Sequence, residues 1–420
     1  MEDTKEILTQ ALSLIKPTKK EEEEVREKVD DILSKINKNL KNARAILGGS
    51  GEKGTWLKEA HDADIFVLFD YKKYENKSDK LADMLRKHLK KMFPDVIQLH
   101  GSRDYFQIKR KDFTFEIVPI LGIKKAEQAK NITDVSPLHA KWVLKYKKLA
   151  DEIRLVKQFC KAANVYGAES YIKGFSGYIC EILAIYYGGF LNLARNAARW
   201  KDKVVIDSAN YYKGKKVMDE MNKSKTYSPL VIIDPVQADR NAAAALSKEK
   251  FDMFREACRK FLKHPSKEFF ERKEISKEGL DKKARGKGLI LLDAKAKAGK
   301  VDVIGSMLLK TLEHFNKKLL ENDFKVYEHG WQWDKKSNVS FYFIVDNKTL
   351  PATKKHIGPP LKADYHAKQF KKKYKRTFTE NGRVCTLVKR AFRKPEGLIR
   401  KSLEDEYVME RVKSIRVGII

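Results

Sequence analysis

Two aspartates, Asp62 and Asp64, stand at the head of a hydrophobic run that continues to Phe69. Because strand side chains alternate between faces, residues i and i+2 project from the same side of one strand. Two carboxylates held side by side repel each other unless a cation lies between them. The spacing therefore predicts a divalent metal site, and Mg²⁺ is the cation that carboxylates and phosphates together favour.

A run of small residues, 48–51, lies upstream of these acids, and Lys53 follows it. Backbone N–H groups, the Ser50 hydroxyl and the Lys53 ammonium all suit a phosphate chain. Small-residue turns are common, so the run says little by itself. Joined to Asp-x-Asp at this spacing, it indicates phosphoryl or nucleotidyl transfer assisted by Mg²⁺.

A third acid, Glu116, is the only charged residue in the apolar run 113–119. An unpaired charge is costly to bury, so we expect Glu116 on a neighbouring strand, completing a catalytic and metal-binding triad with Asp62 and Asp64. One metal would lower the pKa of an attacking 3′-hydroxyl, and the other would clamp a triphosphate. The alternative is an edge-strand acid that faces water.

The elements that must position these acids form an α/β unit over residues 1–136. Residues 5–40 have a helical pattern, and residues 78–92 predict an amphipathic helix. The strands that we expect lie at 43–47, 62–69, 96–100, 105–109 and 113–118.

The rest of the chain predicts two further regions. Residues 137–271 have a nearly all-helical signal, in segments 138–165, 170–198 and 247–263, and indicate a helical central domain. Residues 272–290 are charged and contain glycine, which predicts a linker or exposed loop. A small α+β domain would complete the region 272–420, with a helix at 303–322 and strands at 289–292, 324–328, 339–346 and 383–389.

The charge of the 420-residue chain favours a polyanionic partner. It has 88 Lys and Arg against 57 Asp and Glu, a net charge of +31, and nucleic acid is the first candidate. The alternative is a solvated basic surface. Residues 368–376 interleave positive charge with aromatics, which suits RNA but also fits a solvated basic helix. Trp331 and Trp333 would share a strand face, where core packing is favoured over base stacking.

Cysteine usage and hydropathy indicate the compartment. The four cysteines are scattered without a C-x-x-C pair, which argues against a zinc site and a disulfide framework. The polar start of the chain predicts no signal peptide, and the most apolar stretch, 182–194, is too short to span a bilayer. We therefore expect a cytoplasmic protein with a buried helix or helix pair at 182–194 and no membrane partner.

The series Gly49-Ser50-x-x-Lys53-Gly54-Thr55-Trp56-Leu57, followed by Asp62-x-Asp64, resembles the DNA-polymerase-β-like nucleotidyltransferases. Within them, the chain is similar to the archaeal, class I CCA-adding enzymes (tRNA nucleotidyltransferases) over residues 1–397. Many nucleotidyltransferases share the catalytic motif, whereas the later matching segments are found in a much narrower group. They are 136–143, 174–181, 234–244, 261–266, 358–360 and 380–383.

The resemblance implies an α+β multidomain fold. A polymerase-β-like nucleotidyltransferase head (1–136) would be followed by a helical central domain that completes the nucleotide pocket (137–271) and a C-terminal α+β RNA-binding region (272–420). It implies template-independent, stepwise addition of C, C and A to a tRNA 3′ end from CTP and ATP, with Mg²⁺ and release of pyrophosphate. The partner would be tRNA, bound through its acceptor stem and 3′ end. The oligomeric state, including a homodimer, is left open.

The resemblance also implies residue roles. Asp62, Asp64 and Glu116 would hold the metals, and Arg240 would read the base. The triphosphate contacts would be Ser50, Lys53, His139, Lys157 and Tyr166. From the residues alone, the favoured interpretation of the last three is a helix-entry histidine, a surface lysine and a core aromatic, whereas Arg240 fits a surface or capping arginine equally well.

Two residues depart from the pattern, and rival functions remain. Glu116 stands where many relatives are expected to have Asp, and Glu52 puts an acid beside the phosphate site, so we expect it to point away. A poly(A) polymerase or oligonucleotide synthase of the same fold would use the same triad. An inactive RNA-binding relative is the rival from outside the enzymes.

Overall fold

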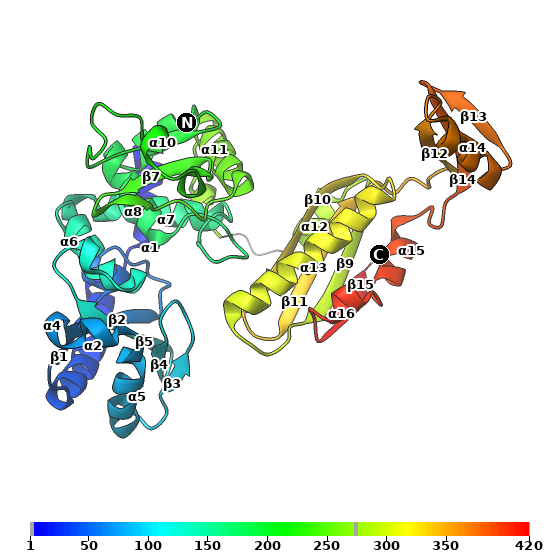
Figure 1. Cartoon of the computed structure of the whole chain (residues 1–420). Helices are drawn as coiled ribbons and strands as arrows, with labels where there is room; N and C mark the ends of the chain where they lie inside the picture. The colour runs from blue at the N-terminus through cyan, green and yellow to red at the C-terminus, as the bar shows by residue number, and fades with distance from the viewer. Residues whose placement is uncertain (1–3, 273–275, 420) are drawn as a thin grey trace. The chain divides into compact units, whose positions relative to one another are not determined.

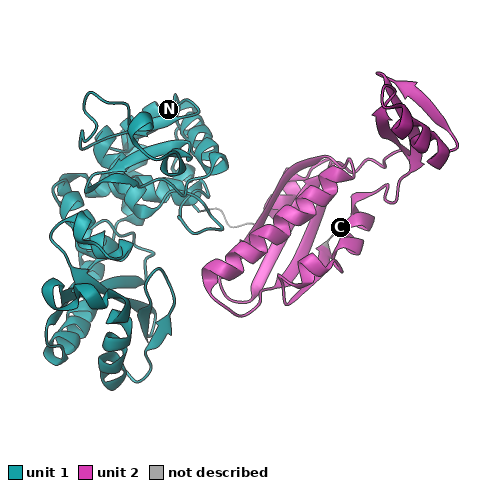
Figure 2. Cartoon of the chain, in the orientation of Figure 1, with its two compact units in different colours: residues 1–273 teal, residues 274–420 magenta. Residues whose placement is uncertain are grey.

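The computed structural model describes residues 4–272 and 276–419, which form two compact units, 1–273 and 274–420 (Figure 2). Residues 273–275 of the predicted linker lie outside the described residues.

A five-stranded sheet of order β1-β2-β5-β4-β3 begins the N-terminal unit (Figure 1). Its central pair, β2 and β5, is parallel, and the outer pairs are antiparallel. All five predicted strands are confirmed, although the last one runs four residues further than expected. Their bounds are β1 (Ala43–Leu47), β2 (Asp62–Asp70), β3 (Ile97–Leu99), β4 (Tyr105–Arg110) and β5 (Phe113–Gly122).

One face of this sheet packs against α2 (Lys19–Asn39) and α5 (Leu81–Met92), which contribute leucines, isoleucines and a valine to a shared core. The β2 residues in that core alternate along the strand: Ala63, Ile65, Val67 and Phe69. Asp62 and Asp64 occupy the intervening positions, so they lie on the opposite face, away from the helices.

The predicted helical segment 5–40 forms two helices, because Pro17 has no N–H to continue the first. Thr18 then caps α2, and its own N–H donates to Glu21 Oε2 at 2.8 Å in a capping box. The first helix, α1 (Thr4–Ile15), packs into the core of the central region and not into the core under the sheet. The predicted domain boundary between residues 136 and 137 stays a prediction. By sequence α1 belongs to the predicted head, but its buried side chains pack in the central region.

The central region is mainly helical, as predicted. Its core joins aliphatic residues to a cluster of aromatic rings that includes Phe159, Phe190, Phe254 and Phe261. The helices around this core are α6 (Ser136–Leu144), α7 (Ala150–Ala162), α8 (Gly177–Tyr187), α9 (Phe190–Ala197) and α11 (Lys248–Lys263).

A nearly all-helical pattern did not predict the small sheet of order β6-β7-β8 in this region. Its strands are β6 (Val204–Ile206), β7 (Leu230–Asp234) and β8 (Gln237–Asn241). All five residues of β7 are buried, so its sequence lacks the polar–apolar alternation that marks a half-exposed strand. These strands lie between the predicted helical segments 170–198 and 247–263, and no strand was predicted there for that reason.

Helices α8 and α9 confirm the predicted buried helix pair. Their axes bend by 93° at Gly188 and Gly189, whose φ angles are 70° and 129°. No single helix in the described part of the chain is long and apolar enough to cross a membrane, and this bent pair meets that test only when both helices are counted together.

Short helical segments complete the N-terminal unit. Two of them change predictions: η1 precedes α5, so the helix predicted at 78–92 begins at Leu81, and α3 replaces the predicted small-residue loop. The segments are α3 (Gly49–Lys53), α4 (Tyr71–Tyr74), η1 (Glu75–Lys80), η2 (Ala126–Gln128), η3 (Ile132–Val135), η4 (Lys147–Leu149), α10 (Val217–Glu220), η5 (Lys223–Thr226) and η6 (Lys267–Phe270).

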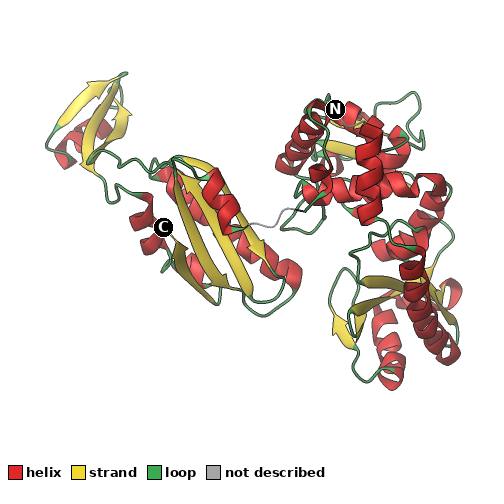
Figure 3. Ribbon diagram, turned by 180° about the vertical axis from the view of Figure 1, so that it is seen from behind, coloured by secondary structure: helices red, strands yellow, loops and turns green. Residues whose placement is uncertain are grey.

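The C-terminal unit contains an antiparallel sheet of order β10-β11-β9-β15 covered by the long helix α13 (Figure 3). Trp331 and Trp333 are partly buried against its core, as predicted. The elements are α12 (Lys277–Lys283), β9 (Gly288–Lys295), α13 (Val301–Glu321), β10 (Val326–Trp333), β11 (Asn338–Val345), α15 (Pro395–Ser402), α16 (Glu406–Met409) and β15 (Ser414–Ile419). Helix α12 shows that the predicted linker was wrong at 277–283, because Leu280 packs against Tyr342 and Ile344.

Residues 353–389 add a three-stranded antiparallel sheet of order β12-β14-β13 and the basic helix α14. Phe370 of α14 stacks on His356 of β12 with ring centroids 5.4 Å apart. The bounds are β12 (Thr353–Pro360), α14 (Asp364–Lys373), β13 (Thr377–Glu380) and β14 (Arg383–Lys389). The basic segment predicted at 368–376 is therefore helical through Lys373.

Candidate active site

The three predicted acids lie on adjacent strands. Asp64 and Glu116 are direct partners in the parallel β2–β5 register, and Asp62 is two residues before Asp64 on the same face. Burial raises the pKa of both Asp64 and Glu116, and the charges of the neighbouring acids raise them further. Lys53 and Lys157 oppose this at Asp64 without reversing it. Burial and repulsion between the acids therefore outweigh the nearby lysines, so the lysines compensate the charge of this cluster only in part.

This donor set fits a divalent cation, although the side chains as placed do not form a metal cage. Among residues 4–272 and 276–419, no three His, Cys, Asp or Glu side chains have the arrangement of metal ligands. The fit rests on chemistry: three carboxylates share one face of two paired strands, and hard oxygen ligands with uncompensated charge suit Mg²⁺. Only Gln107 Nε2 donates to Glu116 among the hydrogen bonds described, at a long 3.4 Å.

Glycines let the segment after β1 pack directly on the acidic strand. The Gly48 N–H donates to the Asp64 carbonyl at 2.8 Å. Gly49 has φ of 57°, and a Cβ built there would lie 1.7 Å from Asp64 Oδ2. No L-residue fits this position without displacing the acid. The close packing brings α3, which contains Ser50 and Lys53, against the strand that holds Asp62 and Asp64.

A buried carboxylate joins two of the predicted triphosphate contacts. Glu181 of α8 is fully buried, and its oxygens lie 2.7 Å from Lys53 Nζ and 2.8 Å from Lys157 Nζ. The Thr55 hydroxyl donates to Glu181 Oε1 at 3.1 Å and accepts from Lys157 at 3.0 Å. Lys157 is only 3% exposed, which excludes the surface-lysine alternative.

The pKa shifts in this cluster follow from burial and charge. Burial lowers the pKa of Lys157, and Lys53 lowers it further against the pull of Glu181. Burial opposes ionisation of Glu181, but the two ammonium groups outweigh it and lower the pKa of this carboxyl. The sequence assigned Glu181 no role. A lone acid in the apolar run 179–185 was the signal that could have identified it, as it did for Glu116.

Tyr166 lies beside this cluster. A Cβ built on Gly177 would lie 3.0 Å from the Tyr166 hydroxyl and 3.7 Å from Lys157 Cε, so the two side chains meet at the start of α8. The Tyr166 ring is partly buried against the central core, and burial raises the pKa of its hydroxyl. Its position therefore fits both the predicted triphosphate contact and the core aromatic.

A second buried carboxylate, Asp234 at the end of β7, holds His139 and Arg240. His139 Nε2 lies 3.0 Å from Asp234 Oδ2, and Arg240 Nη1 contacts the same oxygen. Arg240 therefore pairs with an acid six residues earlier in the chain, Asp234, and not with its neighbour Asp239. His139 lies on α6, which contacts both α3 and α8.

Glu52 does not behave as a solvated acid. Its Oε2 is buried and has no hydrogen-bond partner among the described residues, and burial raises the pKa of the carboxyl. The expectation that it points away from the phosphate site stays a prediction.

Three domain families match the chain in sequence order. They are described as a nucleotidyltransferase domain (residues 26–149), a tRNA nucleotidyltransferase second domain (151–271) and a CCA-adding enzyme C-terminal domain (285–414). The CCA-adding enzyme of Nanoarchaeum equitans is 34% identical over 379 residues, which cover 90% of this chain and 91% of that relative. The chain belongs to the CCA-adding enzymes. A second relative, from Methanosarcina barkeri, is 32% identical over 93% of this chain and 88% of its own length.

Solved structures support the fold of this CCA-adding enzyme. A cytoplasmic RNA terminal U-transferase has a TM-score of 0.51 at 17% identity, over 66% of this chain and all of that one. The Cid1 RNA terminal uridylyl transferase has a TM-score of 0.52 at 16% identity, with the same coverage. At this identity the likeness concerns the fold alone. The predicted α+β multidomain class, with its nucleotidyltransferase head and helical second domain, is confirmed.

Proposed function

We propose that this CCA-adding enzyme extends tRNA 3′ ends by two C and one A, without a template, at a Mg²⁺ site held by Asp62, Asp64 and Glu116. The direct β2–β5 pairing of Asp64 with Glu116 is the observation that supports this site most strongly. When bound, Mg²⁺ would activate the 3′-hydroxyl and neutralise charge on the triphosphate. The acids would hold the cations and position the two reacting groups, with pyrophosphate as the leaving product.

The triphosphate would lie between α3 and the start of α8. Ser50 would donate a hydrogen bond to its oxygens, and Lys53 and Lys157 would supply charge from the Glu181 cluster. His139 and Tyr166 would complete the binding with one donor each. Two ammonium groups share a single carboxylate here, so the cluster retains positive charge to offer a phosphate chain.

Arg240 would read the base of the incoming nucleotide. Its side chain is 27% exposed, so the guanidinium is anchored on Asp234 while part of its donor set remains accessible. On the Watson–Crick edge, N3 of C and N1 of A are acceptors, whereas N3 of U and N1 of G carry a proton and are donors. A guanidinium has donors and no acceptor, so it would pair with C and A and repel the N–H groups of U and G. CTP and ATP would thus be admitted and UTP and GTP rejected.

The tRNA would be bound through its acceptor stem and 3′ end. The net charge of +31 and the exposed lysines of α14 support phosphate contacts over a wide surface. A homodimer remains an open alternative, which light scattering of the purified protein would decide.

A gel assay tests this function. Purified protein would be incubated with Mg²⁺ and tRNA transcripts that end before, within or after CCA, with each nucleotide alone and in combination. We expect two C residues from CTP alone, one A on a CC end, and no addition to a finished end. Long single-base tails would contradict the proposal in favour of a poly(A)-type polymerase, and RNA binding without incorporation would indicate an inactive relative.

A further inference from the structure

The carboxylate of Asp234 is fully buried and saturated with partners. Oδ2 contacts His139 Nε2 and Arg240 Nη1, while Oδ1 accepts hydrogen bonds from the Tyr178 hydroxyl at 3.1 Å and the Val236 N–H at 3.0 Å. Burying a charge is costly unless it is paired in this way.

The partners of Asp234 come from four different elements. His139 belongs to α6, Tyr178 to α8, Arg240 to β8, and Val236 to the turn between β7 and β8. The Tyr178 ring also stacks on His139, with centroids 4.0 Å apart and an interplanar angle of 27°. Asp234 Oδ2 therefore contacts both Arg240, which is proposed to read the base, and His139, which is proposed to contact the triphosphate.

We infer that Asp234 is the positioning residue for nucleotide selection: it orients Arg240 for base reading and links that orientation to His139. This rests on the proposed function. Arg240 is long and partly exposed, so without the anchor its guanidinium would sample many rotamers, and a loosely held donor discriminates poorly between bases. His139 would lose the same anchor, which would weaken binding of every nucleotide regardless of base.

Asp234→Asn tests the inference, because it keeps the shape and removes the charge. The selectivity ratios to measure are kcat/KM for CTP over UTP on a transcript that lacks CCA, and for ATP over GTP on one that ends in CC. We expect both ratios to fall about tenfold, the effect of losing one charge-assisted hydrogen bond, while KM rises for all four nucleotides. Unchanged ratios would overturn the inference.

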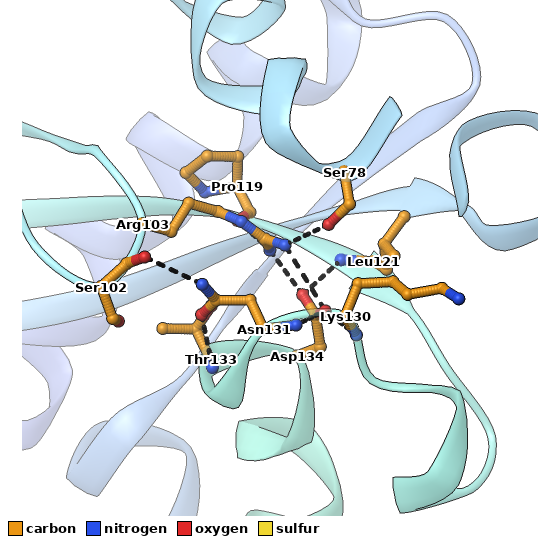
Figure 4. A network of polar contacts seen from close by, with 9 residues as sticks. All are labelled: Ser78, Ser102, Arg103, Pro119, Leu121, Lys130, Asn131, Thr133 and Asp134. Carbon is orange, nitrogen blue, oxygen red and sulfur yellow. Dashed lines mark hydrogen bonds and ion pairs between the residues drawn. The ribbon is translucent and has the colours of Figure 1, made fainter. Parts of the chain in front are cut away.

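A matched control separates selectivity from stability. Asp134 is also fully buried against an arginine, Arg103, and accepts hydrogen bonds from the Leu121, Lys130 and Asn131 N–H groups (Figure 4). Asp134→Asn should lower the unfolding temperature and leave both ratios intact. If its ratios fell as far as those of Asp234→Asn, selectivity would follow general destabilisation and the inference would be wrong.

Two more variants complete the test. Tyr178→Phe keeps the stacked ring and removes only the bond to Oδ1, so it reports on Asp234 even if Asp234→Asn does not fold; we expect the same ratios to fall by a smaller factor. Arg240→Ala distinguishes the two proposals. If it lowers both ratios and the Asp234 and Tyr178 variants do not, the inference alone fails. If Arg240→Ala leaves the ratios unchanged, the proposed base-reading role fails, and the inference with it.

Discussion

Buried acids in the N-terminal unit occur in two opposite electrostatic environments. Asp64 and Glu116 share a face with like charge and have raised pKa values, whereas Glu181 and Asp234 are buried with cations and have lowered ones. A carboxylate with uncompensated charge is suited to bind a metal, and one with compensated charge is suited to hold other side chains in place. The direction of the pKa shift thus separates the two groups of acids.

Asp64→Ala should abolish nucleotide transfer, because the cluster would lose the acid that is proposed to be its central metal ligand. The tRNA affinity should change by less than about twofold, since the positive charge that attracts RNA is spread over the whole chain. The gel assay and a filter-binding titration of the same preparation measure the two effects. Surviving transfer would show that the metal assignment is wrong.

Glu181→Gln should weaken both stability and nucleotide binding. It leaves two ammonium groups near each other without their shared carboxylate, so we expect a loss of about 3 kcal/mol in the free energy of unfolding. KM for CTP and ATP should rise in parallel, because Lys53 and Lys157 are proposed to contact the triphosphate and not the base. Urea unfolding and steady-state kinetics measure both quantities.

Thr55→Val is the matched control for Glu181. It removes one hydroxyl from the cluster and leaves all three charges, so the cost should be only about 1–2 kcal/mol. Equal losses in the two variants would mean that the charge of Glu181 contributes nothing beyond a hydrogen bond.

At the scale of elements, the site depends on α3 lying directly against β2. Gly49→Ala should disturb this contact, because its Cβ would overlap Asp64 Oδ2 and its φ of 57° disfavours any side chain. A shift of about 1 Å in a reacting group can reduce rates by about a hundredfold, and we expect a loss of that order in kcat/KM. Steady-state kinetics on a transcript ending in CC measure it.

Gly54→Ala provides the control for backbone strain. Gly54 has φ of 62° and no atom within 4 Å of a built Cβ, so the substitution carries the left-handed penalty of about 1 kcal/mol without the overlap. Activity should stay within a few-fold of the parent. A similar loss of activity in both variants would attribute the effect to strain in α3 and not to displacement of Asp64.

At the scale of the whole molecule, the excess of positive charge should make tRNA binding steeply dependent on salt. If α14 contacts phosphates, replacing Lys371, Lys372 and Lys373 with Ala should reduce the slope of log K against log salt by about two to three. Filter binding between low and moderate salt measures the slope.

Three lysines of α2, Lys20, Lys35 and Lys38, provide the charge-matched control. Two of them already pair with acids on the same helix, Lys20 with Glu24 and Lys35 with Asp31. Their replacement should change the slope by less than one. An equal change in both variants would show that only the total charge matters and that α14 is no specific contact.

Local sequence patterns predicted the strands of the N-terminal sheet and the acids on them. Alternation along β2 and the apolar run of β5 placed Asp62, Asp64 and Glu116 on strands, and the structure confirms those strands and pairs Asp64 with Glu116. These features depend on neighbours within a few residues, so the pattern of polar and apolar side chains reports them directly. The strand β7 was missed because complete burial on both faces removes that pattern.

The ion pairs between residues far apart in the sequence could not be predicted in the same way. Lys53 and Glu181 are separated by 128 positions, and His139 and Asp234 by 95. Such contacts depend on how α3, α6, α8 and β7 pack together. The periodicity of a sequence predicts which face of an element is buried, but not which other element packs against that face. The local sequence around Lys157 favours a surface lysine, yet Lys157 is buried in α7 and pairs with Glu181. The reason is physical: local sequence determines which face of an element is buried, whereas the pairing of buried charges is settled by the packing of the whole core.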